Sequence, residues 1–354
     1  MKKIVLTGGG TAGHVTPNIA LLPRLKEMGY DIAYIGSLDG IEKKLITDEG
    51  IPYHGIPCGK FRRYLSLKNL SDPFRVIKGI GEAKKILKDY QPNVIFSKGG
   101  FVSVPVVKAA ASLHIPIVIH ESDMTPGLAN KLSLPSATKV CCNFPETVSS
   151  LPAGKAVLTG SPIRAELLKG SRAKALDFTG LPGKKPCLMI IGGSLGAASV
   201  NDAVREALPE LLSDFEVVHL CGKDKTDETL NGTEGYVQYE YIKEELPDLF
   251  ALADIVISRA GANAICELLA LNKPNLLIPL SAQASRGDQI LNAASFEKQG
   301  FSLVLQSENL SKESLLISVR QLYAERDRYT QNMAKQNQRD AITLITDLID
   351  ETAR

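Results

Sequence analysis

The sequence lacks the features that mark several classes of protein. No apolar run approaches the roughly 18 residues that a membrane-spanning helix needs. The first residues lead directly into a predicted strand, without the charged and then apolar pattern of a signal peptide. The six cysteines form no CxxC pair, which predicts reduced core thiols in a cytosolic protein and neither a disulfide framework nor a zinc site. We therefore expect a soluble or peripheral protein.

Tryptophan and a strong net charge are also missing. The 41 lysine and arginine residues nearly balance the 39 aspartate and glutamate residues, so the net charge of +2 gives no case for a nucleic-acid partner. Apolar residues make up 44% of the 354-residue chain and charged residues 23%, which is typical of folded rather than disordered proteins. A chain of this length suits two domains better than one.

The chain does contain a regular alternation of short apolar runs and amphipathic stretches. We expect strands at 3–7, 31–36, 93–97, 115–119, 138–142, 156–159, 186–191, 215–221, 235–239, 254–258, 274–279 and 301–305. Strand–helix alternation with short connections predicts an α/β fold, with a doubly wound and mostly parallel sheet in each half. We expect domains at 1–162 and 163–334, with the C-terminal helix at 335–354 completing the first domain.

Two glycine-rich loops each follow a predicted strand and open a helix. Gly8–His14 follows the strand at 3–7, and Gly192–Ala197 follows the strand at 186–191. Glycine lets the backbone turn sharply and lets a phosphate approach, while the free N–H groups and the positive pole of the helix attract the anion. One such loop is common, but one in each half predicts twin nucleotide-type domains that face each other across a cleft.

The first loop does not fit a nicotinamide site. Gly8, Gly10 and Gly13 match G-x-G-x-x-G, yet the second predicted strand ends in Tyr34–Ser37 without the acidic residue that would bind ribose. His14 stands at the mouth of the following helix. There it can act as a base, bind an anion or only cap the helix.

Three residues in the second half are candidates for binding a nucleotide sugar. Ser194, in the second glycine loop, can clamp a diphosphate or serve only as an N-cap. Glu267 lies two turns into the helix that follows the strand at 254–258, where its carboxylate can accept both ribose hydroxyls or simply be solvated. Gln289, near the start of a later helix, can bind sugar hydroxyls or cap that helix.

A dense group of titratable residues follows the strand at 115–119 in the first half. His120, Glu121 and Asp123 lie within four positions of the sequence. General-base chemistry on a hydroxyl needs such groups. Their spacing fits no metal signature, so we expect no metal here.

The segment 59–88 is strongly basic and interleaved with apolar residues. Against two acids, Asp72 and Glu82, it holds nine basic residues: Lys60, Arg62, Arg63, Lys68, Arg75, Lys78, Lys84, Lys85 and Lys88. A basic and apolar surface suits a bilayer with anionic lipids. A solvated helix with an ordinary buried stripe is the more common explanation of such a pattern.

Seven ordered motifs together resemble the MurG family of peptidoglycan glycosyltransferases, and the resemblance runs through nearly the whole chain. They are GGGTAGHVTPN at 8–18, KGGFVSVP at 98–105, HESDMTPGLANK at 120–131, GSPIR at 160–164, GGSLGAASVN at 192–201, SRAGANAICE at 258–267 and SRGDQILNA at 285–293.

This resemblance implies a GT-B fold and an enzyme on the cytoplasmic face of the membrane. It implies inverting transfer of N-acetylglucosamine from UDP-GlcNAc to the C4 hydroxyl of the muramyl sugar in undecaprenyl-pyrophosphoryl-MurNAc-pentapeptide (lipid I), giving lipid II, with no cofactor. The first domain would hold the acceptor and touch the membrane through 59–88, and the second would bind UDP-GlcNAc.

The resemblance also implies roles for individual residues. Thr11, Ala12 and Gly13 would close over the donor sugar and acceptor; Arg164 would lie near the donor from the hinge; Ser194 would bind the diphosphate; Tyr241, Ile242 and Ala262 would form the uracil pocket; Glu267 would bind ribose; and Gln289 would bind the GlcNAc hydroxyls.

The sequence departs from many MurG relatives at two places. Ala12 stands where many have a glycine, and Asp123 stands where many have an asparagine. A carboxylate at 123 can serve as a base or orient His14, so the order of base candidates is His14, then Asp123 or Glu121. The alternative functions are another lipid glycosyltransferase such as a diacylglycerol glucosyltransferase, a UDP-sugar epimerase, and a nucleotide-sugar-binding module without turnover.

Overall fold

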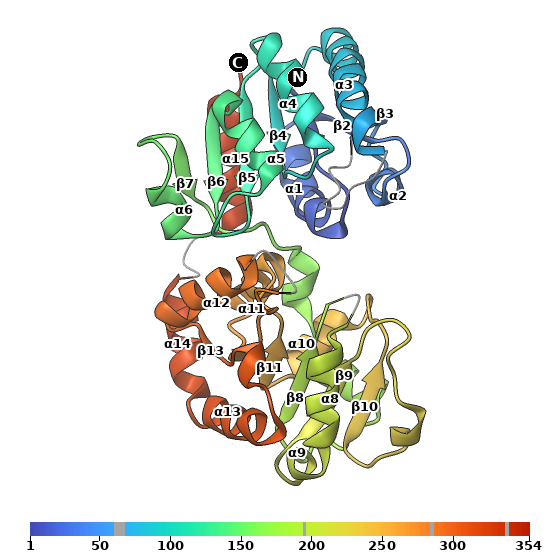
Figure 1. Cartoon of the computed structure of the whole chain (residues 1–354), viewed down its shortest axis with the longest axis vertical. Helices are drawn as coiled ribbons and strands as arrows, with labels where there is room; N and C mark the ends of the chain where they lie inside the picture. The colour runs from blue at the N-terminus through green and yellow to red at the C-terminus, as the bar shows by residue number, and fades with distance from the viewer. Residues whose placement is uncertain (60–67, 194–195, 284–286, 337–339) are drawn as a thin grey trace. The chain divides into compact units, whose positions relative to one another are not determined.

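The computed structural model describes residues 1–59, 68–193, 196–283, 287–336 and 340–354, with no side chain described at 68–73. The chain divides into two compact units, which we call the N-terminal unit (1–164 with 339–354) and the C-terminal unit (165–338). Figure 1 shows that each unit is a sheet with helices packed on it.

The N-terminal sheet has seven parallel strands in the order β3-β2-β1-β4-β5-β6-β7 within the described residues. Their bounds are β1 Lys3–Thr7, β2 Asp31–Ser37, β3 Tyr53–Ile56, β4 Val94–Ser97, β5 Ile117–Glu121, β6 Lys139–Cys142 and β7 Ala156–Leu158. The sequence predicted all of these except β3. That strand carries His54 and Gly55 and is only half-buried over most of its length, so it lacks an apolar signature.

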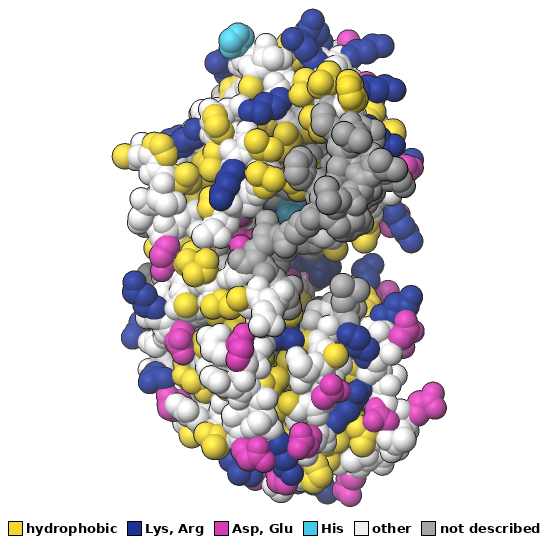
Figure 2. All heavy atoms as spheres, in the orientation of Figure 1, with side chains coloured by type: hydrophobic (Ala, Val, Ile, Leu, Met, Phe, Trp, Pro, Cys, Tyr) yellow, Lys and Arg dark blue, Asp and Glu magenta, His cyan; other side chains and the backbone are white. Residues whose placement is uncertain are grey.

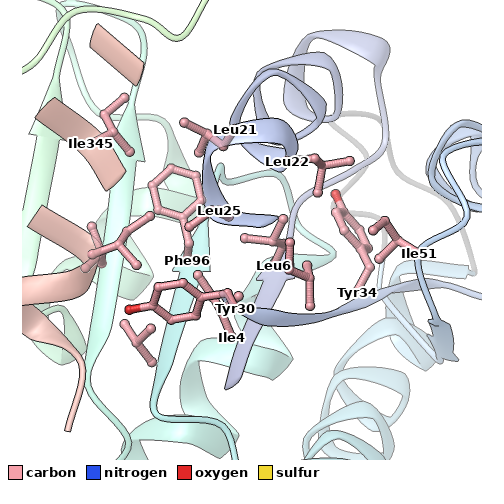
Figure 3. Close-up of a cluster of buried hydrophobic side chains, with 14 of the residues drawn as sticks. Ile4, Leu6, Leu21, Leu22, Leu25, Tyr30, Tyr34, Ile51, Phe96 and Ile345 are labelled. Atoms are coloured by element: carbon pink, nitrogen blue, oxygen red, sulfur yellow. The ribbon is translucent and has the colours of Figure 1, made fainter. Parts of the chain in front are cut away.

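Helices cover both faces of this sheet. They are α1 Thr16–Glu27, α2 Ile41–Asp48, α3 Lys68–Tyr90, α4 Ser103–Ser112, α5 Leu128–Ser133, α6 Pro145–Ser149 and α15 Ala341–Thr352. Because successive strand residues point to opposite faces, Ile4 and Leu6 of β1 face α1 and α15, while Val5 faces α3 and α4. Figure 3 shows Leu21 of α1 and Ile345 of α15 near Phe96 of β4.

The C-terminal helix α15 belongs to the N-terminal unit, although residues 165–338 separate the two in sequence. Its Ile345, Leu348 and Ile349 are buried in the same hydrophobic cluster as β1. Asp350 anchors its last turn, accepting from Lys2 Nζ at 2.8 Å and from the Tyr30 hydroxyl at 2.6 Å. Apolar burial therefore fixes this helix, and the polar contacts set its end.

The C-terminal sheet has six parallel strands in the order β10-β9-β8-β11-β12-β13 within the described residues. Their bounds are β8 Cys187–Ile191, β9 Glu216–Leu220, β10 Tyr236–Tyr239, β11 Ile255–Ser258, β12 Asn275–Leu277 and β13 Ser302–Val304. The helices are α7 Arg172–Thr179, α8 Ala198–Glu206, α9 Leu208–Asp214, α10 Leu246–Leu252, α11 Ala262–Ala270, α12 Asp288–Lys298, α13 Lys312–Ala324 and α14 Arg326–Gln336. Every predicted strand of this half is present.

The cysteines lie as the sequence predicted, as free thiols in the core. Five of the six are buried, and Cys58 is half-buried. Within the described part of the chain, no helix is long and apolar enough to cross a membrane.

Candidate active site

The strand order of each sheet reverses at one point, and the glycine loops lie there. In the N-terminal unit the reversal falls between β1 and β4, so the loops after these strands meet at the carboxyl edge of the sheet. Lys98 N donates to Thr7 O at 2.9 Å, and a Cβ on Gly100 would clash with the carbonyl oxygen of Gly9. The two loops are therefore in backbone contact, which Gly100 permits.

Buried polar side chains hydrogen-bond to the first glycine loop from the protein interior. The Tyr34 hydroxyl donates to Gly8 O at 2.8 Å, and Asn18 Nδ2 donates to the Tyr34 oxygen at 3.0 Å. Both side chains are fully buried. Burial raises the pKa of Tyr34 above its usual value, so its hydroxyl stays protonated and keeps donating to the loop.

His14 ends a short 3-10 helix, Ala12–His14, just beyond this support. The Thr11 hydroxyl lies 3.0 Å from His14 Nδ1, and Thr11 and Ala12 are exposed while Gly13 and His14 are half-buried. For His14 to accept a proton at Nε2, its Nδ1 must carry the other proton, and Thr11 Oγ1 is placed to accept a hydrogen bond from it.

His120 is fully buried and is held from both ring nitrogens. Lys98 Nζ lies 2.9 Å from Nδ1, and Gly160 O lies 2.9 Å from Nε2. Because a lysine only donates and a carbonyl only accepts, Nδ1 accepts and Nε2–H donates. Burial, followed by the charge of Lys98, lowers the pKa of His120 well below its usual value. A histidine held neutral in this way supports the loop and is not a proton acceptor.

Glu121 faces the protein interior. Its carboxylate accepts from Asp123 N at 3.0 Å, Gly127 N at 3.2 Å and Asn130 Nδ2 at 2.8 Å. Burial raises the pKa of Glu121 to about 7. Glu121 therefore shapes the loop that carries Asp123, which is half-buried.

The reversal in the C-terminal sheet falls between β8 and β11, and the second glycine loop follows β8. Gly196 N donates to Gly193 O at 2.9 Å, and a Cβ on Gly196 would clash with Cys221 O. Lys225 Nζ lies 3.4 Å from Gly196 O, which puts an ammonium beside the loop. Ser194, the predicted diphosphate ligand, lies outside the described residues.

A buried network fixes the strand ends behind the second loop. His219 Nδ1 lies 3.0 Å from the Tyr236 hydroxyl, and Nε2 lies 3.0 Å from Asn201 Oδ1. Asn201 Nδ2 donates in turn to Cys221 O at 2.9 Å, against which Gly196 packs. Burial lowers the pKa of His219 to about 3, so this network is neutral.

Arg259, directly after β11, contacts the strand-end loops beside it and the helix that follows the second glycine loop. Its Nη1 donates to Ile278 O at 3.0 Å and to Ser307 Oγ at 2.9 Å, and its Nη2 donates to Ser199 Oγ on α8 at 3.1 Å. The guanidinium thus adds a second cation near the start of α8. The residue before that helix, Ala197, has no side-chain acceptor for the first N–H groups.

The other donor-site candidates occupy separate loops and helices of the C-terminal unit. Ala262 and Glu267 lie on α11, where Ala262 is buried and Glu267 is half-buried. Gln289, on α12, accepts from Leu280 N at 3.1 Å through its Oε1. Tyr241 is exposed and Ile242 half-buried in the loop after β10. Arg164, the last residue of the first part of the N-terminal unit, is half-buried.

The basic segment predicted at 59–88 lies partly outside the described residues, because Lys60, Arg62 and Arg63 are among those not described. The rest forms α3, which has two faces. Ala83 and Leu87 are buried against the sheet, whereas Phe74 is 75% exposed and Ile77 66% exposed. Figure 2 shows Lys and Arg side chains bordering hydrophobic ones over this part of the N-terminal unit. The buried face fits the ordinary buried stripe, and contact of the exposed face with a membrane stays a prediction.

Both halves of the chain match one family. Residues 4–142 match the glycosyltransferase family 28 N-terminal domain, and residues 187–349 match the glycosyltransferase family 28 C-terminal domain. A protein of Lachnospira eligens is 66% identical over 354 residues, covering 100% of both chains. One of Lachnoclostridium phytofermentans is 64% identical over 351 residues, covering 99% of both. Each is named as a UDP-N-acetylglucosamine--N-acetylmuramyl-(pentapeptide) pyrophosphoryl-undecaprenol N-acetylglucosamine transferase.

The chain belongs to glycosyltransferase family 28.

A solved structure of MurG matches the chain over nearly its whole length. The crystal structure of Acinetobacter baumannii MurG matches with a TM-score of 0.79 at 26% identity, covering 99% of this chain and 100% of that one. The resemblance to MurG and the α/β GT-B fold with two doubly wound sheets, both expected from the sequence, are confirmed.

Sequence reasoning missed several side chains that shape the site of this family 28 enzyme. Lys98 and Arg259 stood within the quoted motifs but had no role assigned. Glu42 was not considered, because an acid was sought at the end of the second strand and not on the helix after it.

Proposed function

We propose that this chain transfers N-acetylglucosamine from UDP-GlcNAc to the C4 hydroxyl of MurNAc in undecaprenyl-pyrophosphoryl-MurNAc-pentapeptide. The single observation that supports this most strongly is the identity of 64–66% along essentially the whole length with curated transferases of that name. The product is a lipid-linked disaccharide for cell-wall synthesis, which gives the enzyme its role in cell shape and division.

In this proposal the C-terminal unit binds the donor. The diphosphate lies at the Gly192–Ala197 turn, where backbone N–H groups and the start of α8 stabilise the charge that develops on departing UDP. Glu267 accepts the ribose hydroxyls. Gln289, whose Oε1 already accepts from Leu280 N, uses its donor end on the GlcNAc hydroxyls. Tyr241, Ile242 and Ala262 hold the uracil, and Arg164 lies near the donor.

The N-terminal unit supplies the proton acceptor. His14 removes the proton from the acceptor hydroxyl as that oxygen attacks the anomeric carbon, and UDP leaves from the opposite face, so one displacement inverts the anomeric centre. The contact between Thr11 Oγ1 and His14 Nδ1, at 3.0 Å, supports this role because it can fix the required tautomer. Asp123 is the second candidate, and the inward-facing carboxylate of Glu121 makes it the third.

The exposed face of α3 contacts the cytoplasmic surface of the membrane that carries the lipid acceptor. Phe74 and Ile77 are three positions apart and so share a helix face, and Arg75, Lys78 and Lys85 are exposed around them. Apolar side chains among exposed basic ones suit an interface of anionic head groups and acyl chains.

Vesicle flotation tests the membrane proposal. Changing Arg75, Lys78 and Lys85 to glutamine removes three charges, each worth about 1 kcal/mol near an anionic surface, so binding to anionic vesicles falls by about 100-fold. The matched control changes Lys169, Lys174 and Lys298, exposed residues of the C-terminal unit. Equal losses in both triple variants contradict the assignment of this face.

The function itself is tested by identifying the product. Purified protein is incubated with UDP-GlcNAc, UDP-glucose and a short-chain lipid I analogue, and with diacylglycerol in parallel. We expect GlcNAc on the lipid I analogue only. Glucosyl diacylglycerol would favour the other lipid glycosyltransferase, interconversion of free UDP-sugar would favour an epimerase, and UDP binding without any product would favour a binding module.

A further inference from the structure

Glu42 lies beneath the first glycine loop, although it comes from α2 and not from a strand. Its side chain is fully buried. Oε2 accepts from Gly10 N at 3.2 Å, while Oε1 accepts from Ser37 N at 3.1 Å and from Ser37 Oγ at 2.5 Å. Three donors on one carboxyl group suit the ionised form, which only accepts. The carboxylate thus ties the loop after β1 to the end of β2.

The carboxylate packs so closely against the glycines around it that no side chain fits at their positions. A Cβ on Gly9 would lie 2.5 Å from Glu42 Cδ, and a Cβ on Gly40 would clash with its Oε1. Gly10 has a φ of +86°, which only glycine adopts without strain, and this conformation turns its N–H toward the carboxylate. The loop sequence and Glu42 therefore form one packed unit.

The Glu42 carboxylate accepts from Gly10 N, a backbone donor of the kind that anions use at glycine loops. A phosphate that approached Gly10 N would meet a buried negative charge within a few ångströms, where repulsion is weakly screened. The first loop therefore has its own internal anion at this N–H group. The carboxylate holds the loop rigidly, and Thr11 and His14 extend from the loop beyond it.

We propose that Glu42 is a positioning residue: it locks the first glycine loop through Gly10 N, so that the loop presents His14 to the acceptor hydroxyl instead of binding a diphosphate at Gly10. This inference rests on the proposed function for the role of His14. The lock itself is a property of the loop and can be measured without turnover.

The test compares two buried glutamates that carry out the same structural task in different places. Glu42→Gln keeps the shape of the side chain but has only one acceptor oxygen. With that oxygen on the two Ser37 donors, the amide N–H faces Gly10 N–H. Glu216→Gln makes the same change in the C-terminal unit, where Glu216 is 2% exposed and accepts from Gly183 N at 3.0 Å, Lys184 N at 2.8 Å and Lys185 N at 3.4 Å. Glu216 begins β9 and so lies at the sheet edge opposite the glycine loop.

Two readouts are measured on the full-length chain: hydrogen exchange of peptides that cover residues 8–14, and steady-state kinetics with UDP-GlcNAc and the lipid I analogue. In Glu42→Gln we expect exchange at 8–14 to accelerate by at least ten-fold and kcat to fall by about ten- to 100-fold, because a small displacement of a catalytic group has effects of this size. The KM for UDP-GlcNAc stays within two-fold. In Glu216→Gln both exchange at 8–14 and kcat stay within two-fold of the wild type.

Unchanged exchange at 8–14, a retained kcat in Glu42→Gln, or equal kcat losses in the two variants would each overturn the proposal. If the wild-type chain transfers no GlcNAc, the proposed function fails, and the exchange comparison still decides whether Glu42 locks the loop.

Discussion

The two glycine loops share a sequence pattern and a place in their sheets, but the charged side chains that hydrogen-bond to their backbones differ in sign. A buried carboxylate, Glu42, accepts from Gly10 N at 3.2 Å in the first loop. At the second loop an ammonium, Lys225 Nζ, lies 3.4 Å from Gly196 O, and the Arg259 guanidinium lies 3.1 Å from Ser199 Oγ on the following helix. Glycine spacing alone therefore does not distinguish the two loops, whereas the charge that contacts each loop does.

This difference matches the division of work that we propose. The leaving diphosphate gains negative charge, so it needs N–H groups and cations. The proton acceptor needs to be held in place. In this proposal the second loop supplies N–H groups and cations, the first loop holds His14 in place, and one motif carries out two tasks.

We expect the largest effect on activity from replacing His14 in the first loop. His14→Ala removes the proposed base from the first loop and leaves the second loop untouched. We expect kcat to fall by about 10²- to 10⁴-fold with UDP affinity unchanged, measured by steady-state kinetics and by calorimetric titration with UDP. Asp123→Asn, assayed in parallel, shows whether the carboxylate shares the task. A fully active His14→Ala variant removes His14 as the base.

We expect the second-largest effect on the KM for the donor, UDP-GlcNAc. Glu267→Ala removes two hydrogen bonds to a charged group, so the KM for UDP-GlcNAc rises by about ten- to 100-fold. Gln289→Ala, which loses neutral hydrogen bonds, has a smaller effect on the same constant. The control is Glu297→Ala, at an exposed position on α12. Unchanged donor kinetics in both Glu267→Ala and Gln289→Ala count against the assigned donor site.

A smaller effect concerns the buried histidine behind the second loop. His219 titrates near 6.5 in the unfolded chain, whereas burial lowers its pKa to about 3 in the folded protein. Protons therefore favour the unfolded state, and the stability is present above about pH 7 and lost as the pH falls toward 3. Between pH 7.5 and 5.5 the C-terminal unit loses about 1.4 kcal/mol through this group.

Hydrogen exchange of β8 and β9 at pH 7.5 and 5.5, corrected for intrinsic rates, measures this loss. His219→Gln destabilises the unit at both pH values, but the difference between them shrinks by about 1.4 kcal/mol. A difference equal to that of the wild type would show that His219 does not stay neutral.

The smallest effect comes from reversing the charge at the second loop. Lys225→Glu makes its surroundings resemble those of the first loop, and this two-unit change of charge at a partly exposed site costs about 1 kcal/mol in total. We expect the KM for UDP-GlcNAc to rise by about five-fold, and by less at high salt. Lys223→Glu, at an exposed neighbouring position, is the control. A rise equal in both variants indicates net charge and not position.

The sheets were predictable because their strands are short apolar runs, while β3 was not, because Tyr53–Ile56 is half-buried and contains Gly55. We expected the C-terminal helix to complete the first domain, but the cluster that Ile345 joins is settled by packing and not by the local pattern. The loop that carries His14 and the helix that carries Glu267 were predictable, since segments that follow parallel strands gather at one edge of the sheet.

The supporting contacts were not predictable from the sequence, since they join residues from different elements. The pairing of Lys98 with His120 spans 22 positions, and that of Gly10 with Glu42 spans 32. Neither spacing has a periodicity that would mark it. The opposite charges behind the two loops therefore became visible only in the folded chain.

A crystal structure of the full chain with UDP-GlcNAc tests the central claim most directly. We predict diphosphate density at the Gly192–Ala197 turn, with Gly10 N still on the Glu42 carboxylate. Diphosphate bound at Gly8–Gly13, with Glu42 displaced, would contradict it.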